Sequence, residues 1–328
     1  MTPDLRGRQL GQRIRAVRQA AGLSGPRAAR ALGISVAQLS RMESGHRGCT
    51  LLNVALLLGL CRVSSVDRAE ILALCRRSTE AEEDRGYGCW VRPHLGGPSE
   101  GVSAVAFAYE TANSVVCCEP AGLPVLLQTG EFLEADLANR GVDPARWLPP
   151  RRRHRSVLFA ERGPDVVCFL HEATLRSLPV DEPVRQSQLI HLSMLIGQER
   201  LAVRIVPVER DRALMGGAFA VLRFGEFEPV VCVPCETVTL MLEQKRNLAA
   251  YEQRLRVLDR ISLSERDSAA MIMSIIGRSE SGFREDAVAT DGLAAGGGRG
   301  PVDETAAAAL ETSVGPPHPG GAQRAQGQ

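Results

Sequence analysis

The sequence has no apolar stretch long enough to cross a membrane. Its longest apolar run, from Leu51 to Leu60, contains Asn53 and is shorter than the roughly 18 residues that a transmembrane helix needs. The N-terminal residues are charged, and no apolar segment followed by a small-residue cleavage site is found there. We therefore expect a cytoplasmic protein, neither secreted nor embedded in a membrane.

Several residue types that mark other protein classes are scarce or irregular. Aromatic residues make up 4% of the chain, Lys245 is the only lysine, and the nine cysteines form an odd number at irregular spacing. Without an export signal, such cysteines are expected to be reduced thiols and not a disulfide framework. A GC-rich genome explains the shortage of lysine, because arginine codons are GC-rich. The arginine excess alone therefore does not indicate DNA binding.

The sequence contains no pattern typical of catalysis: no phosphate-binding loop of the Walker type, no nucleophile elbow and no catalytic carboxylate pair. His171 and Glu172 begin like the zinc-protease helix motif, but Leu175 stands where that motif needs its second histidine. Cys232 and Cys235 have the spacing of a redox or metal pair without a second pair nearby. We expect them to be strand cysteines, and a redox or metal role is the alternative. The sequence predicts no enzyme, no metal and no cofactor.

Charge is distributed unevenly along a chain whose formal net charge is only +1. Residues 1–78 contain 13 arginines and 4 acidic residues, whereas residues 79–150 contain 4 arginines and 11 acidic residues. A basic module joined to a near-neutral or acidic body indicates a polyanion partner at the N-terminal end. The length of 328 residues gives room for about two domains.

Apolar spacing and capping residues predict an all-α domain of five helices over residues 8–78. Leu10 and Ile14 recur at helical spacing, and Ser35 and Thr50 stand where N-caps of later helices are expected. These signals are local, so they define the helices without knowledge of the tertiary structure.

The remainder divides into a linker, a mixed domain and a tail. Residues 79–101 combine acidic residues with Gly and Pro, as linkers do. Residues 102–277 alternate strand and helix patterns and predict an α/β or α+β domain of undefined strand order. Residues 278–328, rich in Gly, Ala and Pro, are expected to be disordered. The expected strands are 166–170, 203–206, 219–224 and 230–233, and the expected helices are 184–196, 247–259 and 264–276.

Residues 10–45 have the pattern of a helix-turn-helix. Two short helices flank a tight turn at Gly33, and their lengths allow perpendicular packing. The second helix, residues 36–44, would lie in the major groove with Leu39 and Met42 facing inward. Of the outward side chains, Gln38 can pair with adenine and Arg41 with guanine or phosphate. The residues expected to contact DNA are Ser24, Ser35, Val36, Ala37, Gln38, Ser40, Arg41 and Arg47.

Three segments carry a family resemblance: AAGLS at 20–24, ALGIS at 31–35 and QLSRMESG at 38–45. They resemble the repressor-type helix-turn-helix of the XRE (xenobiotic response element) family. The resemblance implies a five-helix DNA-binding domain and a structural ion pair between Arg18 and Glu43. In that family a glutamine usually follows the capping residue and contacts phosphate. Gly25 stands at that position here, which puts one phosphate contact in question.

The second half of the chain resembles a domain of unknown function that follows such helix-turn-helix domains in many regulators of high-GC Gram-positive bacteria. The resemblance implies regulators that are often encoded beside a small acidic partner protein, in an antitoxin-like pairing. The segments that carry it are YETANSVVCCEPAGLPVLLQT, HEATLRS, RQSQLIHL, VRIVP, GGAFAVLRF and CVPCETVTLMLE, in that order along the chain.

Together these observations predict a sequence-specific transcriptional regulator. It would bind double-stranded DNA as a homodimer, lie on the nucleoid when bound, and dimerise, sense or bind a partner through its C-terminal domain. The alternative is an antitoxin-like protein that sequesters a small acidic partner encoded nearby and regulates its own synthesis. The basic run 151–155 is expected to be a solvated helix face, with contact to phosphate or to an acidic protein as the alternative.

Overall fold

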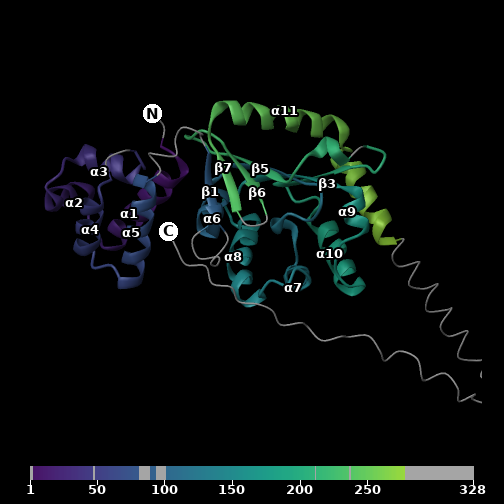
Figure 1. Cartoon of the computed structure of the whole chain (residues 1–328), viewed down its shortest axis with the longest axis horizontal. Coiled ribbons are helices and arrows are strands. Elements are labelled where there is room, and N and C mark those ends of the chain that lie inside the picture. The colour runs from purple at the N-terminus through teal and green to yellow at the C-terminus, as the bar shows by residue number, and fades with distance from the viewer. Residues whose placement is uncertain are drawn as a thin grey trace, which may run out of the picture. The chain divides into compact units, whose positions relative to one another are not determined.

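The computed structural model describes residues 3–46, 49–80, 89–93, 101–210, 212–235 and 238–277 (Figure 1). They form an N-terminal helical domain and an α/β domain, which confirms the fold class expected from the sequence. The expected disordered tail, residues 278–328, lies outside the described residues.

Five helices make up the N-terminal domain, and their starts follow the local capping signals. Ser35 and Thr50 each accept a hydrogen bond from a first-turn backbone N–H, and Asp4 does the same at the first helix. Leu10, Ile14 and apolar side chains from the other helices share one buried core. The helices are α1 (Leu5–Ala20), α2 (Gly25–Leu32), α3 (Val36–Glu43), α4 (Leu51–Leu60) and α5 (Ser65–Glu80).

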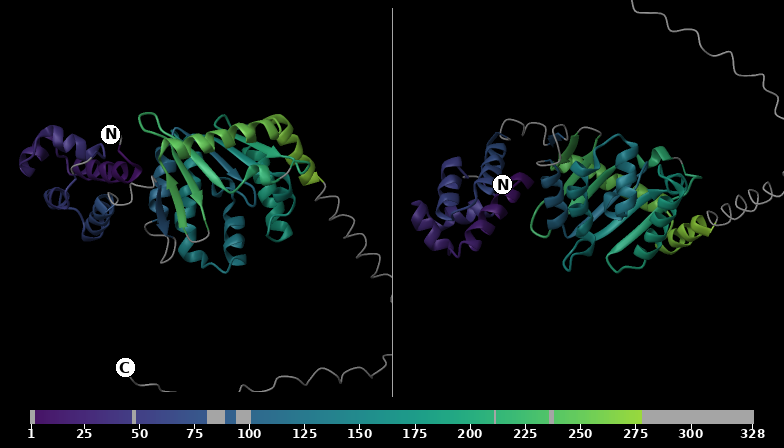
Figure 2. Two further views of the ribbon diagram at one scale, coloured as in Figure 1. Left: turned by 45° about the horizontal axis from the view of Figure 1, so that its top comes forward. Right: turned by 90° about the horizontal axis from the view of Figure 1, so that it is seen from below.

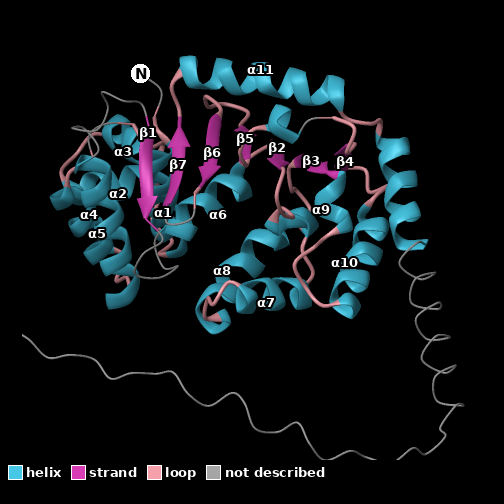
Figure 3. Cartoon of the chain, turned by 45° about the vertical axis from the view of Figure 1, so that its right-hand side comes forward, coloured by secondary structure: helices cyan, strands magenta, loops and turns pink. Residues whose placement is uncertain are grey.

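Seven strands form one mixed sheet in the order β1-β7-β6-β5-β2-β3-β4, seen nearly edge-on in Figure 3. The pairs β2–β3 and β3–β4 are parallel, and every other neighbouring pair is antiparallel. The strands are β1 (Cys89–Pro93), β2 (Ser114–Glu119), β3 (Asp165–His171), β4 (Leu201–Val206), β5 (Phe219–Arg223), β6 (Val230–Pro234) and β7 (Val238–Leu242).

Helices cover both faces of this sheet (Figures 2 and 3). Alternate residues of β2 therefore enter different cores: Val115 and Cys117 pack on one side, Val116 and Cys118 on the other. A strand buried on both faces carries no polar alternation, which explains why β2 is apolar almost throughout. Helix α11 (Lys245–Ile261) covers one face. The other face carries α6 (Gly101–Thr111), α7 (Gly130–Asn139), α8 (Pro144–Ser156), α9 (Glu172–Arg176) and α10 (Glu182–Leu195).

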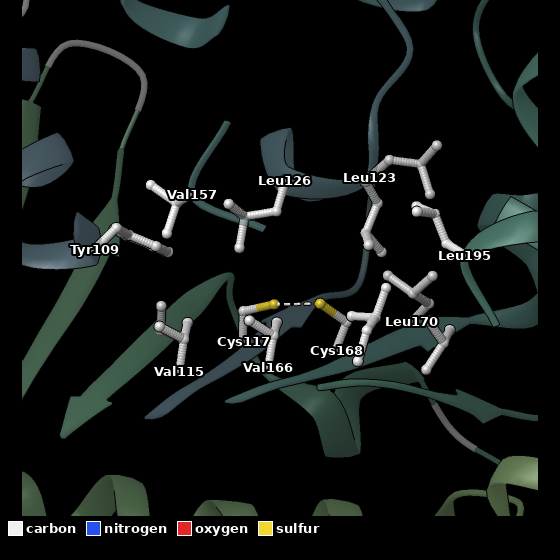
Figure 4. Packing of buried hydrophobic residues seen from close by; sticks show 14 of the residues in the cluster. Tyr109, Val115, Cys117, Leu123, Leu126, Val157, Val166, Cys168, Leu170 and Leu195 are labelled. Atoms are coloured by element: carbon white, nitrogen blue, oxygen red, sulfur yellow. Dashed lines mark hydrogen bonds between the residues drawn. The ribbon is translucent and has the colours of Figure 1, made fainter. Parts of the chain in front are cut away.

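Two cysteines lie side by side in the larger core (Figure 4). Cys117 on β2 and Cys168 on β3 are register partners, and their Sγ atoms are 2.9 Å apart. Their mutual hydrogen bond and the surrounding apolar burial raise the pKa of Cys117 well above its ordinary value. Cys117 therefore stays an uncharged thiol, and both buried free cysteines pack as small apolar side chains.

The described structure adds elements where the sequence signals were weak. Strand β1 lies within the stretch 79–101 that we assigned to a linker, and it pairs with β7 at an edge of the sheet. Strands β2 and β7 were not expected either, because short apolar runs do not distinguish a strand from a buried helix. Helix α1 begins at Leu5, three residues earlier than expected, since Asp4 caps it.

The first turn of α1 also contacts the α/β domain. The backbone N–H of Leu5 donates to the Glu243 carboxylate, with N···O distances of 3.2 and 3.3 Å. The Arg8 guanidinium lies over the rings of Phe224 and Phe227, 4.6 and 4.7 Å from their centroids. Burial lowers the pKa of Arg8, while Glu243 at 3.9 Å favours its charged form. A single helix thus contributes side chains to two cores, Leu5 to one and Ile14 to the other.

Candidate nucleic-acid interface

Helix α3 presents two different faces. Leu39 and Met42 are fully buried in the core of the helical domain, as their spacing predicted. Ser35 caps the helix by accepting from the backbone N–H of Gln38, at 3.0 Å. This bond fixes where the helix begins and therefore which side chains point away from the core.

The outward face of α3 carries most of the side chains expected to contact DNA. Val36 is 51% exposed, and Ala37, Ser40 and Arg41 are exposed, while Gln38 is half-buried beside them. An aliphatic group, an amide and a guanidinium on one helix face are the groups that contact thymine methyl, adenine and guanine edges. The face thus contains the chemistry needed for direct readout.

An ion pair holds the end of α3 against α1. Arg18 Nε and Nη2 donate to the two carboxylate oxygens of Glu43, at 2.5 and 2.9 Å, and both side chains are 10% exposed. Arg18 Nη1 also donates to the carbonyl of Leu23 in the turn before α2. The hydrogen bond to Glu43 raises the pKa of Arg18 above its ordinary value. These contacts join α1, the α1–α2 turn and α3, so they determine the orientation of α3.

The approach of α3 to α1 also depends on a residue without a side chain. A Cβ atom added to Gly11 would lie 2.6 Å from the carbonyl oxygen of Glu43 and 2.7 Å from the backbone nitrogen of Gly45. Backbone atoms cannot move aside as a flexible side chain can. Gly11 therefore sets how closely the end of α3 packs on α1.

The remaining expected DNA contacts have different surroundings. Ser24 precedes α2 and is exposed, and its hydroxyl makes no capping bond to that helix. Gly25, which replaces the usual glutamine, is the first residue of α2. Arg47 lies outside the described residues. The hydroxyl of Ser24 is therefore not used to cap α2, and the phosphate contact by Ser24 stays a prediction.

The other motifs singled out in the sequence have structural contacts. Glu172 accepts from the backbone N–H of Val208 at 3.0 Å and from Arg176 Nε at 2.7 Å, so its carboxylate is occupied within the fold. Cys232 is buried on β6, whereas Cys235 is exposed beyond its end. Among the described residues, no group of three or more potential metal ligands is found.

The basic run 151–155 forms part of α8 and makes its contacts inside the α/β domain. Arg152 pairs with Glu134 at 2.8 Å, and Arg153 pairs with Glu110 at 2.6 Å. Arg155 donates to the carbonyl of Gln128, at 3.1 Å. The two carboxylates thus neutralise the charges of Arg152 and Arg153 without an external ligand.

Sequence reasoning missed Arg8 and Arg254. The contacts of Arg8 with Phe224 and Phe227 join residues more than 200 positions apart in the sequence. Arg254 on α11 packs against the loop at Gly216. Neither arginine belongs to a local motif, so only the folded chain reveals its surroundings.

Two protein-family profiles match the chain. A helix-turn-helix domain matches residues 9–74, and a domain of unknown function, DUF5753, matches residues 104–274, which is more than half of the 328 residues. The comparison with curated proteins gave no match. In the described parts of the chain, no helix combines the length and apolar character needed to cross a membrane. The chain belongs to the family defined by DUF5753, and its N-terminal helix-turn-helix domain indicates a DNA-binding regulator.

Proposed function

We propose that the protein is a sequence-specific transcriptional regulator, without catalytic activity, that reads the major groove through α3. The observation that carries this proposal is the outward face of α3, with Val36, Gln38 and Arg41 held in place by the Arg18–Glu43 pair. The charge of residues 1–78, 13 arginines against 4 acidic residues, supports it, because phosphate attraction supplies much of the affinity for DNA. Such a regulator would act in the cytoplasm, on the nucleoid.

The proposal predicts that Arg41→Ala weakens specific binding without unfolding the protein. Arg41 is exposed, so its removal leaves the core intact and loses a groove contact worth about 1–3 kcal/mol if it reads a base. The bound sequence is first selected from a random double-stranded pool with the full chain. Affinity for that sequence is then measured by fluorescence anisotropy, and stability by urea unfolding.

The matched control is Arg256→Ala, which removes an exposed arginine from α11 in the other domain. It should bind the selected DNA as the parent protein does, because it loses the same charge away from α3. Unchanged affinity for Arg41→Ala would contradict groove reading by this face, and so would equal losses for both variants.

An exposed row of leucines on α4 supports the antitoxin-like alternative as well as a homodimer. Leu52, Leu56 and Leu60 follow one another at four-residue spacing on α4 and are 67%, 49% and 41% exposed. Val66, at the start of α5, is exposed too. A helix that is apolar on all sides is normally covered. On a domain rich in arginine, this leucine face fits either a second copy of the chain or an acidic partner protein.

The oligomeric state separates these alternatives. We expect the purified chain to sediment as a dimer, and Leu52→Gln/Leu56→Gln to raise the dimer dissociation constant at least tenfold by removing apolar contact. Leu51→Gln, at the less exposed start of the same helix, is the control. A dimer that survives the double substitution would place dimerisation in the α/β domain. A parent protein that sediments only as a monomer would favour the acidic partner.

A further inference from the structure

The α/β domain contains a cavity between α11 and the ends of two strands. It encloses about 410 Å³, within the usual range of roughly 300–1,000 Å³ for small-molecule sites. The lining residues are Gly216, Gly217, Ala218, Phe219, Val233, Ala250, Tyr251 and Arg254. Four of them are Gly or Ala, so small side chains leave the space open.

Arg254 supplies the charge in this cavity. Its Nη1 donates to the carbonyl of Met215 at 3.1 Å, in the short 3-10 helix Arg212–Met215 before the cavity loop. Among the described residues, no carboxylate pairs with it, since the neighbouring Glu252 is paired with Arg223 at 2.7 Å. Arg254 therefore presents a half-buried guanidinium whose charge is not neutralised by an acidic neighbour.

Gly216 is required for this placement of Arg254. It has a φ of +71°, and a Cβ atom built on it would lie 1.3 Å from Arg254 Nη1. Any side chain at this position would displace the guanidinium. The next two backbone N–H groups, of Gly217 and Ala218, donate to no described backbone carbonyl. Both residues line the cavity together with Arg254.

Aromatic side chains form the apolar part of the cavity. The rings of Phe219 and Tyr251 are 4.9 Å apart and inclined by 57°, in a tilted contact that fixes both. Phe219 is buried, and Tyr251 is half-buried. Burial raises the pKa of Tyr251, so its hydroxyl stays protonated and can donate a hydrogen bond. A flat apolar group has aromatic surface to contact here.

We propose that this cavity binds a small organic anion with a flat apolar body, such as an aromatic carboxylate or phosphate ester. The Arg254 guanidinium would bind the anionic group through two parallel hydrogen bonds, and Tyr251 with Phe219 would contact the flat body. A cation would meet an unneutralised positive charge, and a neutral ligand would leave the guanidinium unpaired. The inference concerns the α/β domain alone and does not depend on DNA binding by α3.

The test uses four probes of one shape with the full chain: benzoate and phenyl phosphate as anions, benzyl alcohol as the neutral analogue and benzylamine as the cation. Binding is measured by saturation-transfer NMR and isothermal titration, without DNA. We expect the two anions to bind with dissociation constants on the order of 1 mM, as suits ligands of this size. The alcohol and the amine should bind at least tenfold more weakly.

Two variants locate the binding. Arg254→Gln should weaken benzoate at least tenfold, whereas Arg256→Gln, an exposed arginine of the same helix, should leave it unchanged. Ala250→Phe fills the cavity from the exposed side of α11, so it should abolish binding even if Arg254→Gln proves poorly folded. The proposal is overturned if benzoate and phenyl phosphate do not bind at a concentration 20 times the expected dissociation constant. It is equally overturned by amine binding as tight as benzoate, or by full binding to Ala250→Phe.

Discussion

Arg18→Ala should lower the free energy of unfolding of the helical domain by roughly 3 kcal/mol. The substitution leaves Glu43, which is only 10% exposed, as a nearly buried carboxylate without its partner, and breaking a buried pair in this way costs about 3–5 kcal/mol. It also removes the bond to the Leu23 carbonyl. Urea unfolding followed by circular dichroism at 222 nm measures the loss. Tryptophan fluorescence reports the α/β domain separately, because Trp90 and Trp147 both lie outside residues 1–80.

A double substitution shows whether Arg18→Ala destabilises the domain by leaving Glu43 unpaired or only by removing the packing of the arginine side chain. Arg18→Ala/Glu43→Ala leaves no unpaired charge, so it should recover part of the stability, with a coupling energy of about 1–3 kcal/mol between the two sites. Arg18→Lys keeps the charge but has no planar fork for two parallel bonds, and it should fall between the parent and Arg18→Ala. If Arg18→Ala is as stable as the parent protein and Arg41→Ala unfolds, α3 is rotated about its axis. The side chains assigned to the DNA-reading face would then be wrong.

The affinity for DNA should fall steeply with salt. A dimer that contacts about eight phosphates gives a log–log slope on the order of −7, which corresponds to a loss of roughly 10⁴ in affinity between 50 and 200 mM salt. The measurement is anisotropy titration on the selected sequence over that range. A slope near zero would exclude a phosphate-based interface and with it the proposed function.

The slope also separates the roles of individual arginines. If Arg41 reads a base, its removal should weaken binding to the selected sequence and leave the slope nearly unchanged. If it contacts phosphate, its removal should weaken all sequences alike and reduce the slope by about 1. Arg256→Ala should change neither quantity, since it lies on α11 in the α/β domain.

The helical domain was predictable because its signals are local. Ser35 and Thr50 precede their helices directly, and the inward spacing of Leu39 and Met42 needs no knowledge of distant residues. The ion pair between Arg18 and Glu43 was implied by the family resemblance, since no spacing rule joins residues 25 positions apart on different helices.

The sheet was harder to predict because its strands depend on partners far along the chain. β2 is apolar on both faces, a pattern that a buried helix shares. β1 lies in a Gly- and Pro-rich stretch, and it forms a strand because it pairs with β7, about 150 residues later. The cavity could not be foreseen for the same reason, since Gly216 and Arg254 meet only when α11 lies on the sheet.

The shared helix α1 has a consequence for cooperativity. Leu5 is counted in the core of the α/β domain and Ile14 in that of the helical domain, and fewer than three turns of one helix join them. Helix formation propagates along the chain, so loss of the first turn weakens the turn that follows. Loss of order in one domain is therefore expected to lower the stability of the other domain through α1. Breaking the hydrogen bond between Leu5 and Glu243 frees the first turn of α1. Because α3 packs on the same helix, this local opening beside the sheet should also reduce the fraction of molecules in which α1 is fully ordered.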